Sequence, residues 1–372
     1  MIIQRKEAVE PKVAETDAQR AWTSWALQRI DAELTRCGET PLLRMPLPEQ
    51  WGIDLYLKDE SRQPTGSLKH RLARSLFIYA LCNGWLSEGK RVIEASSGST
   101  AVSEAYFARL LGLPFTAVMP RSTSRAKVER IEELGGTCHL VEDPTMIYSE
   151  SQRLAEELNG IYLDQFTYAE RASEWGGDGN IASSVLSQLH REQFPIPSWI
   201  VVGAGTGGTS ATFGRHCRLE GYDTRVAVAD PEGSAYAQAW ETGNLHTTAT
   251  GSKIEGIGRP RVEPSFIPEL VDSVVRVPDP ASVAAMRFCS KELGQLVGGS
   301  TGTALWAALV KISEMRKQGV RGSVVTVICD HGERYLDTYY NDQWLETQGI
   351  EISQYMTQLE VFFSTGELIA LN

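Results

Sequence analysis

The chain has 372 residues, of which 42% are hydrophobic and 22% are charged, so it is long enough to form two globular domains. Its formal net charge of −11 argues against nucleic acid or an anionic membrane surface as the main partner. No apolar run approaches the length of a membrane span, and the apolar part of the N-terminal segment is too short for a secretory signal, so we expect a cytoplasmic protein without a membrane partner.

Strands and helices alternate along most of the chain. Residues 21–36 have the periodicity of an amphipathic helix, and residues 54–58 alternate like a strand. Further on, short apolar strands are followed by helical segments. The predicted strands are 91–95, 115–119, 137–141, 199–202, 225–229 and 324–328, and four helices begin near residues 101, 124, 145 and 210. This alternation predicts an α/β fold with parallel sheets covered on both faces.

The cysteines and histidines give no metal-binding pattern. The six cysteines are scattered without a C-x-x-C pair, and segments such as residues 327–329 place them in apolar surroundings. We therefore expect reduced, buried thiols rather than disulfide bridges or zinc ligands. Four of the histidines show no ligand spacing, and no metal site is predicted from them. They are His139, His190, His216 and His246.

The segment 63–71 (QPTGSLKHR) places a lysine where its amine can react. Pro64 and Gly66 favour a turn, and the apolar residues from Leu68 onward have the spacing of a buried helical face. Lys69 then lies in the first helical turn, where the helix dipole disfavours a positive charge. A neutral amine there can attack a carbonyl and hold an aldehyde as a Schiff base. A solvated lysine on an amphipathic helix is the structural alternative.

A glycine-rich loop at residues 202–210 (VGAGTGGTS) follows a strand and opens a helix. Such a loop lets the backbone approach a phosphate group, and Thr206, Thr209 and Ser210 can add hydroxyl donors. The same glycines fit G-x-G-x-x-G, with Asp230 about twenty residues further on, so an NAD-dependent oxidoreductase is an alternative. That fingerprint usually opens a domain, however, and it leaves the lysine turn unexplained. A purely structural turn is a third interpretation.

Together, the lysine turn and the glycine loop give the chain a resemblance to the cysteine synthase/cystathionine β-synthase family of pyridoxal-phosphate enzymes. Further motifs agree in order between about residues 40 and 340. They are 40–42 (TPL), 57–60 (LKDE), 96–101 (SSGSTA), 164–166 (DQF), 255–258 (EGIG), 266–268 (FIP), 298–302 (GGSTG) and 330–336 (DHGERYL). The resemblance implies fold type II, the tryptophan synthase β-like fold, with two doubly wound, mostly parallel sheet domains.

The resemblance also implies a domain organisation. We expect a mobile arm at 1–20 and an N-terminal α/β domain at 40–165 that contains Lys69 and a carboxylate-binding loop. A C-terminal α/β domain is expected to combine 21–39 with 166–345 and to contain the phosphate loop. Residues 346–372 would form a C-terminal tail without an assigned role. The family resemblance further suggests a homodimer.

Each site residue receives a role from the resemblance. Lys69 would hold the aldehyde of pyridoxal 5'-phosphate and then act as the base at the substrate Cα. The other cofactor contacts would be Ser99, Gly205, Thr206, Gly207, Gly208, Thr209 and Ser300, and the substrate contacts would be Ser96, Ser97, Ser99, Thr100, Gln165 and Gly256. A simple helix cap is the structural alternative for the serine-rich loop, and a serine bonded to backbone is the alternative for Ser300.

Several positions depart from the family pattern. Ser99 stands where the family usually has asparagine, and His70 stands where aspartate usually follows the lysine. Residues 167–177 and 259–265 also differ from simple cysteine synthases, and 164–172 resemble a bacterial cysteine desulfhydrase branch. Both loops are expected near the substrate.

The predicted reaction is β-elimination on a cysteine-like L-amino acid through an aminoacrylate intermediate. A hydroxyl at Ser300 cannot protonate the pyridine nitrogen as a carboxylate can, which favours loss of a β-substituent over transamination. The preferred activity is L-cysteine desulfhydrase, which releases pyruvate, ammonia and hydrogen sulfide. Cysteine synthase or cystathionine β-synthase type β-replacement, from O-acetylserine or serine with sulfide or a thiol, is the alternative. A non-catalytic relative is a further class, and the retained Lys69 argues against it.

Overall fold

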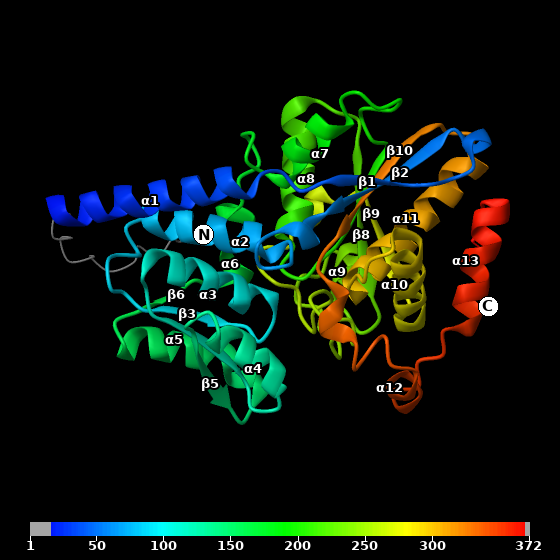
Figure 1. Ribbon diagram of the computed structural model, residues 1–372. Helices are drawn as coiled ribbons and strands as arrows, with labels where there is room; N and C mark the ends of the chain where they lie inside the picture. Colours follow the sequence, from blue (N-terminus) through cyan, green and yellow to red (C-terminus); the bar gives the residue numbers. More distant parts are fainter. Residues whose placement is uncertain (1–15, 369–372) are drawn as a thin grey trace.

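The computed structural model describes residues 16–368, and its strands form two sheets that lie side by side (Figure 1). The smaller sheet has four parallel strands in the order β5-β4-β3-β6. Its strands are β3 (Val92–Ala95), β4 (Phe115–Pro120), β5 (Thr137–Val141) and β6 (Ile161–Tyr162).

The larger sheet has six strands in the order β1-β2-β10-β7-β8-β9. Its strands are β1 (Leu42–Met45), β2 (Ile53–Asp59), β7 (Trp199–Gly203), β8 (Arg225–Pro231), β9 (Ser273–Val277) and β10 (Gly322–Ile328). Strand β1 pairs with β2 antiparallel, and the other pairs in this sheet are parallel, with Leu55 opposite Val324.

Helices cover both faces of each sheet. Alternating residues of β4 show this directly, because Ala117 belongs to the core under the helices α2 and α3 while Val118 packs toward α5 on the other face. On the larger sheet, α10, α11 and α13 cover one face and α7 and α8 cover the other. The helices are α1 (Asp17–Cys37), α2 (Lys69–Cys82), α3 (Ser99–Leu111), α4 (Arg125–Glu132), α5 (Ile147–Glu157), α6 (Gln165–Ala172), α7 (Ile181–Leu189), α8 (Gly208–Glu220), α9 (Tyr236–Thr242), α10 (Asp279–Leu293), α11 (Gly299–Lys317), α12 (Asp342–Thr347) and α13 (Ser353–Thr365).

This architecture confirms the predicted fold class of two mostly parallel, doubly wound sheets. The strand predicted at 137–141 matches β5, and the helices predicted near 124 and 210 begin at Arg125 and Gly208. Strands β1, β6 and β9 were not predicted from the sequence. Strand β6 has only two residues, so its pattern is too short to recognise.

The structure groups the N-terminal segments differently from the predicted domains. Helix α1, expected with the C-terminal domain, buries Ala26 and Ile30 in the same core as Leu72 and Phe77 of α2. Strands β1 and β2, expected in the N-terminal domain, belong to the larger sheet because β2 pairs with β10. Pairing between strands so far apart in sequence is not specified by local spacing. The domain boundaries near residues 165 and 345 stay predictions.

The two ends of the described chain are helical. Most of the expected arm at 1–20 lies outside the described residues, and residues 17–20 begin α1, which Thr16 caps by accepting the Gln19 N–H at 3.2 Å. In the C-terminal tail, Leu359 and Phe362 of α13 are buried in the larger core, and the Phe362 ring meets Trp51 edge-on at 5.5 Å. Within residues 16–368, no helix combines the length and apolar character needed to cross a membrane.

Candidate active site

The predicted site loops lie at the carboxyl ends of parallel strands, the edge where α/β sheets usually bind ligands. The lysine turn follows β2, the glycine loop follows β7, and the segment 329–336 follows β10. These three strands are neighbours in the larger sheet and run parallel, so their loops leave from one edge. The serine-rich loop leaves the corresponding end of β3 in the smaller sheet.

The lysine turn is fixed to the end of β10 by backbone hydrogen bonds. The Leu68 N–H donates to the Cys329 carbonyl at 2.8 Å, and the His331 N–H donates to the Gly66 carbonyl at 3.2 Å. Gly66 has a φ of +74°, and a Cβ there would lie 3.0 Å from the His331 ring. The turn predicted at Pro64 and Gly66 is therefore confirmed, and Lys69 is the first residue of α2.

The surroundings of Lys69 favour its neutral amine. The net effect of its surroundings lowers the pKa of Lys69 to about 8: burial is the largest cause, Cys329 and Glu94 oppose it, and the Arg259 guanidinium adds to it. Burial is therefore the main cause, whereas the sequence analysis relied on the helix dipole. A lysine with this pKa supplies far more neutral amine near neutral pH than an ordinary lysine does.

The glycine loop brings its backbone close to the lysine. A Cβ at Gly205 would lie 2.3 Å from the Gly256 carbonyl oxygen and 3.8 Å from the Lys69 Nζ atom. Gly207 has a φ of +93°, and a Cβ there would lie 2.5 Å from the Phe266 Cα atom. Both positions therefore require glycine.

Helix α8 begins directly after this loop, so its first backbone N–H groups lack partners within the helix. A phosphate group fits such a cradle, since it accepts these hydrogen bonds and carries the charge that the helix dipole favours. The loop and the amine together suit a phosphorylated aldehyde.

A cavity of about 380 Å³ is lined by both Lys69 and this loop. Lys69, Thr206, Gly208 and Thr209 are among its lining residues, so four of the predicted cofactor contacts share one space. Helices α1 and α2 and the segment 172–181 supply much of the remaining wall. The lining does not include Ser300, Gln165, Gly256 or the serine-rich loop.

The predicted substrate contacts form a second group around the start of α3. The Thr100 hydroxyl donates to the Gln165 Oε1 atom at 2.8 Å, so two of these residues are in direct contact. The Gln165 N–H in turn donates to Glu94 at 3.3 Å, and burial raises the pKa of the Glu94 carboxyl to about 8. Ser96 accepts the Gly98 N–H at 3.3 Å, and Ser97, the residue between them, is half-buried.

Ser300 and Lys69 are both close to the same residue, Cys329. It is the second residue of α11, is 5% exposed, and hydrogen-bonds the Cys329 thiol. That thiol is close enough to Lys69 for the two groups to affect each other's pKa values. Ser300 and Lys69 therefore flank Cys329. The pKa of Cys329 is raised to about 12 by burial, so the thiol stays neutral.

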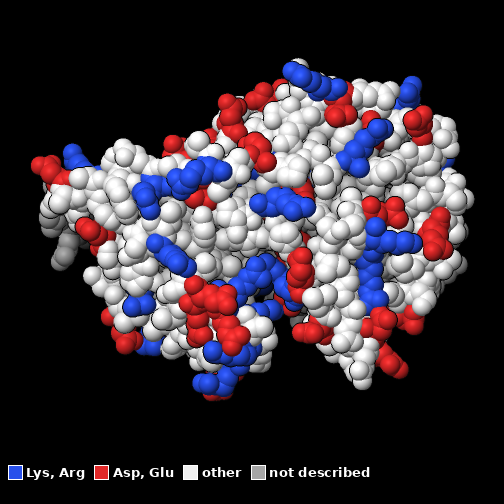
Figure 2. Space-filling model, in the orientation of Figure 1, with Lys and Arg blue, Asp and Glu red and all other residues white. Residues whose placement is uncertain are grey.

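The sequence analysis missed the arginines beside the site. Arg334 donates to the Ser99 hydroxyl, and its Nε and Nη2 atoms are buried without a hydrogen-bond partner in the described chain. The Nη2 atoms of Arg334 and Arg130 both lie 3.7 Å from the position of a Cβ on Gly66. Figure 2 shows Lys and Arg side chains in the hollow between the two parts of the molecule. Arg334 lies inside the motif 330–336, for which the resemblance implied no site residue.

Asp230, the carboxylate of the dinucleotide fingerprint, hydrogen-bonds the backbone of a helix. Asp230 is 1% exposed, and its Oδ2 atom accepts the Ala237 N–H at 2.7 Å. A buried carboxylate that holds the first turn of α9 is not free to bind a ribose hydroxyl. This contact removes the main support for an NAD-dependent oxidoreductase.

All six cysteines are free, and three of them are buried as expected. Cys37 and Cys82 are exposed, contrary to that expectation, because both stand at the last residue of a helix rather than in a strand.

Comparisons with known proteins agree with this geometry. The chain is 56% identical over 344 residues to L-cysteine desulfhydrase Cds1 of Mycobacterium tuberculosis, covering 91% of this chain and 94% of that protein. It is 30% identical to a cysteine synthase of Aquifex aeolicus, covering 81% and 89% of the two chains. A crystal structure of an O-ureido-L-serine synthase mutant with bound O-ureido-L-serine matches with a TM-score of 0.69 and 25% identity, covering 86% of this chain and 98% of that one.

Residues 34–330 match the family described as pyridoxal-phosphate dependent enzymes. The matched region contains the lysine turn, the serine-rich loop, the glycine loop and Ser300. The protein therefore belongs to the family of pyridoxal-phosphate dependent enzymes.

Proposed function

We propose that this protein is an L-cysteine desulfhydrase, which converts L-cysteine and water into pyruvate, ammonia and hydrogen sulfide. The observation that supports this most is the 56% identity, over 91% of the chain, to a protein of that name. The placement of Lys69 beside the glycine loop gives the activity a physical basis.

Lys69 is proposed as the catalytic residue. When bound, pyridoxal phosphate would supply an aldehyde for the substrate amino group and a ring that withdraws electrons from Cα. The neutral Nζ atom of Lys69 takes the proton from Cα, for which its pKa of about 8 is well suited. The Cβ–S bond then breaks and sulfur leaves as hydrogen sulfide, while the three-carbon remainder takes up water to give pyruvate and ammonia.

The remaining site residues are proposed to bind and orient. Gly205, Thr206, Gly207, Gly208 and Thr209 would hold the phosphate with backbone and hydroxyl donors, and Ser99 and Ser300 would contact the ring. Ser96, Ser97, Ser99, Thr100, Gln165 and Gly256 would contact the substrate. Ser300 is a neutral hydroxyl beside a neutral thiol, so it offers the ring no negative charge. That environment favours loss of the β-substituent.

The proposal is tested with purified protein, added pyridoxal phosphate and L-cysteine. We expect equimolar pyruvate and sulfide from the wild type and at least a thousandfold slower release from Lys69→Ala, on the order of the loss when a catalytic nucleophile or base is removed. Lys90→Ala, at another half-buried lysine outside the site, is the matched control. If O-acetylserine with sulfide gave cysteine while L-cysteine gave neither product, β-replacement would be the correct activity.

We further propose that the protein acts as a homodimer, as the family resemblance implies, and that it does so in the cytoplasm, as the sequence predicts. Trp25 of α1 and Ile78 of α2 are large apolar side chains exposed on neighbouring helices, which suits an association surface. Light scattering after size exclusion should give twice the chain mass of 41.0 kDa, and cell fractionation should place the protein in the soluble cytoplasmic fraction. A particle of single-chain mass would exclude the dimer.

A further inference from the structure

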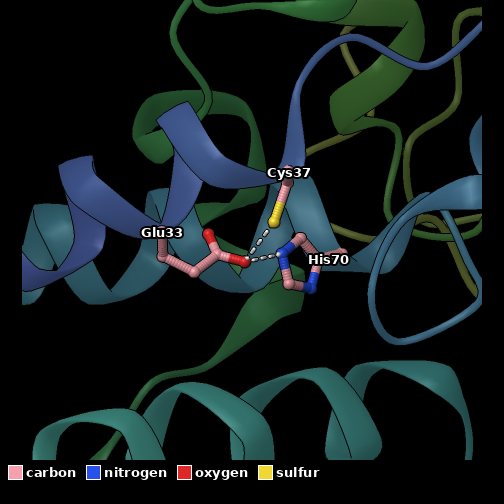
Figure 3. Close-up of side chains that lie close together, drawn as sticks. All are labelled: Glu33, Cys37 and His70. Atoms are coloured by element: carbon pink, nitrogen blue, oxygen red, sulfur yellow. Dashed lines mark hydrogen bonds and ion pairs between the residues drawn. The ribbon is translucent and has the colours of Figure 1, made fainter.

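Three side chains outside the proposed reaction meet between α1 and α2 (Figure 3). Glu33 and Cys37 are four residues apart in α1 and therefore lie on one face of that helix. His70, the second residue of α2, faces them. The Glu33 Oε1 atom is 2.9 Å from the Cys37 Sγ atom and 3.0 Å from the His70 Nε2 atom. One candidate ligand atom from each residue lies within 4.8 Å of the other two.

The burial of this cluster leaves one acceptor without a partner. The side chain of His70 is 0% exposed and that of Glu33 is 1% exposed. The Glu33 Oε2 atom has no hydrogen-bond partner among the described residues, although it is buried. A buried carboxylate oxygen without a partner is costly, and such groups are normally paired or bound to a cation. Cys37 is exposed and gives the cluster a route to solvent.

The His70 ring is held in a fixed orientation. Its Nδ1 atom lies 3.3 Å from the Thr65 hydroxyl, and that hydroxyl lies 2.8 Å from the Ser103 hydroxyl. The Nε2 atom is therefore the nitrogen that faces Glu33. Metal-bound histidines usually have this arrangement, with one ring nitrogen on the metal and the other hydrogen-bonded to the protein. Tyr106 orients Glu33 in a similar way, since its hydroxyl donates to Oε1 at 3.2 Å.

We propose that Glu33, Cys37 and His70 form a Zn²⁺ site that joins α1 to α2. Thiolate, imidazole and carboxylate are the three ligand types that zinc uses in proteins, and three protein ligands leave a fourth position for water. Binding replaces the thiol proton, which is released to solvent. The thiolate and the carboxylate then balance the charge of the ion. For a tetrahedral ion with ligands at about 2.0–2.3 Å, the Glu33 Oε1 atom would need to lie roughly 0.3 Å further from the His70 Nε2 atom and roughly 0.6 Å further from the Cys37 Sγ atom.

The position of this site gives it a structural consequence. His70 directly follows Lys69, and Asp31 and Leu34 of α1 line the same cavity as Lys69. Zinc would therefore fix α1 against the lysine turn and hold one wall of the cavity in place. It touches neither the proposed cofactor contacts nor the proposed substrate contacts, so its role is to stabilise this wall.

The test measures Zn²⁺ itself on the full-length protein loaded with pyridoxal phosphate and freed of metal by a chelator. We expect about one Zn²⁺ per chain and a raised unfolding temperature when Zn²⁺ is returned. Cys37→Ser and His70→Gln should each weaken Zn²⁺ binding at least about tenfold and remove the temperature shift. Cys82→Ser, which removes the other exposed cysteine of these two helices, should bind Zn²⁺ like the wild type.

Co²⁺ provides a second readout that reports the ligands directly. A thiolate-to-cobalt absorption band should appear in the wild type and in Cys82→Ser and be absent from Cys37→Ser. Equal Zn²⁺ affinity in the wild type and Cys37→Ser would overturn the proposal and indicate a surface site only. So would the lack of any stoichiometric binding to the wild type. If His70→Gln failed to fold, the exposed position of Cys37 would keep the comparison possible. Neither result depends on the identity of the substrate, so the proposed activity and this site fail separately.

Discussion

The starts of α8 and α3 are two candidate anion sites that are built in different ways. At α8 the donors belong to the backbone, and the decisive features are absent side chains at Gly205 and Gly207. At α3 the polar groups are side chains: the Ser99 hydroxyl accepts from Arg334, and the Thr100 hydroxyl donates to Gln165, so both are held by distant parts of the chain. The site at α8 depends on a contiguous loop whose glycines leave no room for a side chain. The site at α3 depends on contacts with distant residues, and each of these contacts can be removed separately by substitution.

The largest expected effect is at the backbone site. Gly207→Ala adds a Cβ 2.5 Å from the Phe266 Cα atom at a φ of +93°, so both a clash and backbone strain result. We expect the free energy of unfolding to fall by about 2–4 kcal/mol and cofactor binding to be lost. Denaturant unfolding and cofactor absorbance measure the two effects.

Gly221→Ala is the matched control for this substitution. Gly221 ends the same helix with a φ of +69°, but a Cβ there meets no atom within 4 Å. It should cost only the backbone strain of about 1 kcal/mol and leave cofactor binding intact. If the two substitutions had equal effects on unfolding free energy and cofactor binding, the requirement for glycine at position 207 would not come from close packing around the loop.

Asp230 lies at a third strand end, that of β8, and its titration shows whether this buried carboxylate has a structural role. Burial raises the pKa of Asp230 to about 6, above the unfolded value of about 3.9. The stability it contributes is therefore fully present below about pH 4 and is lost as the pH rises through 6. Asp230→Asn keeps an acceptor for the Ala237 N–H but cannot ionise.

Between pH 4 and 7, the wild type should accordingly lose about 2 kcal/mol of unfolding free energy relative to Asp230→Asn. Denaturant unfolding of both proteins across this pH range measures the difference, in which the contributions of all other groups cancel. A difference that does not change with pH would show that Asp230 has the same pKa in the folded and unfolded chain.

The same contrast explains what could be predicted from the sequence. The glycine loop and the lysine turn are contiguous segments with backbone requirements, so their residues were identified along with the strands that precede them. Arg334 was not assigned a site role, because its contact with Ser99 joins positions 235 residues apart. The placement of α1 on α2, and with it the Glu33–Cys37–His70 cluster, likewise depends on packing that no local spacing reveals.

The smallest predicted effect concerns the side-chain site. Arg334→Met removes the donor to Ser99 and a buried positive charge that has unpaired N–H groups. A hydrogen bond to a charged group contributes roughly 1.5–3 kcal/mol, and because this bond orients Ser99 rather than touching the substrate, we expect only the lower end, a rise in the KM for the amino acid of about tenfold. Cofactor affinity should change by less than about threefold, because the phosphate donors at α8 are untouched. Arg125→Met, at an exposed arginine of α4, should leave both constants unchanged. An equal loss of cofactor and substrate affinity in Arg334→Met would mean that the two anion sites are coupled. The backbone donors at α8 and the side chains at α3 would then not serve the cofactor and the substrate separately.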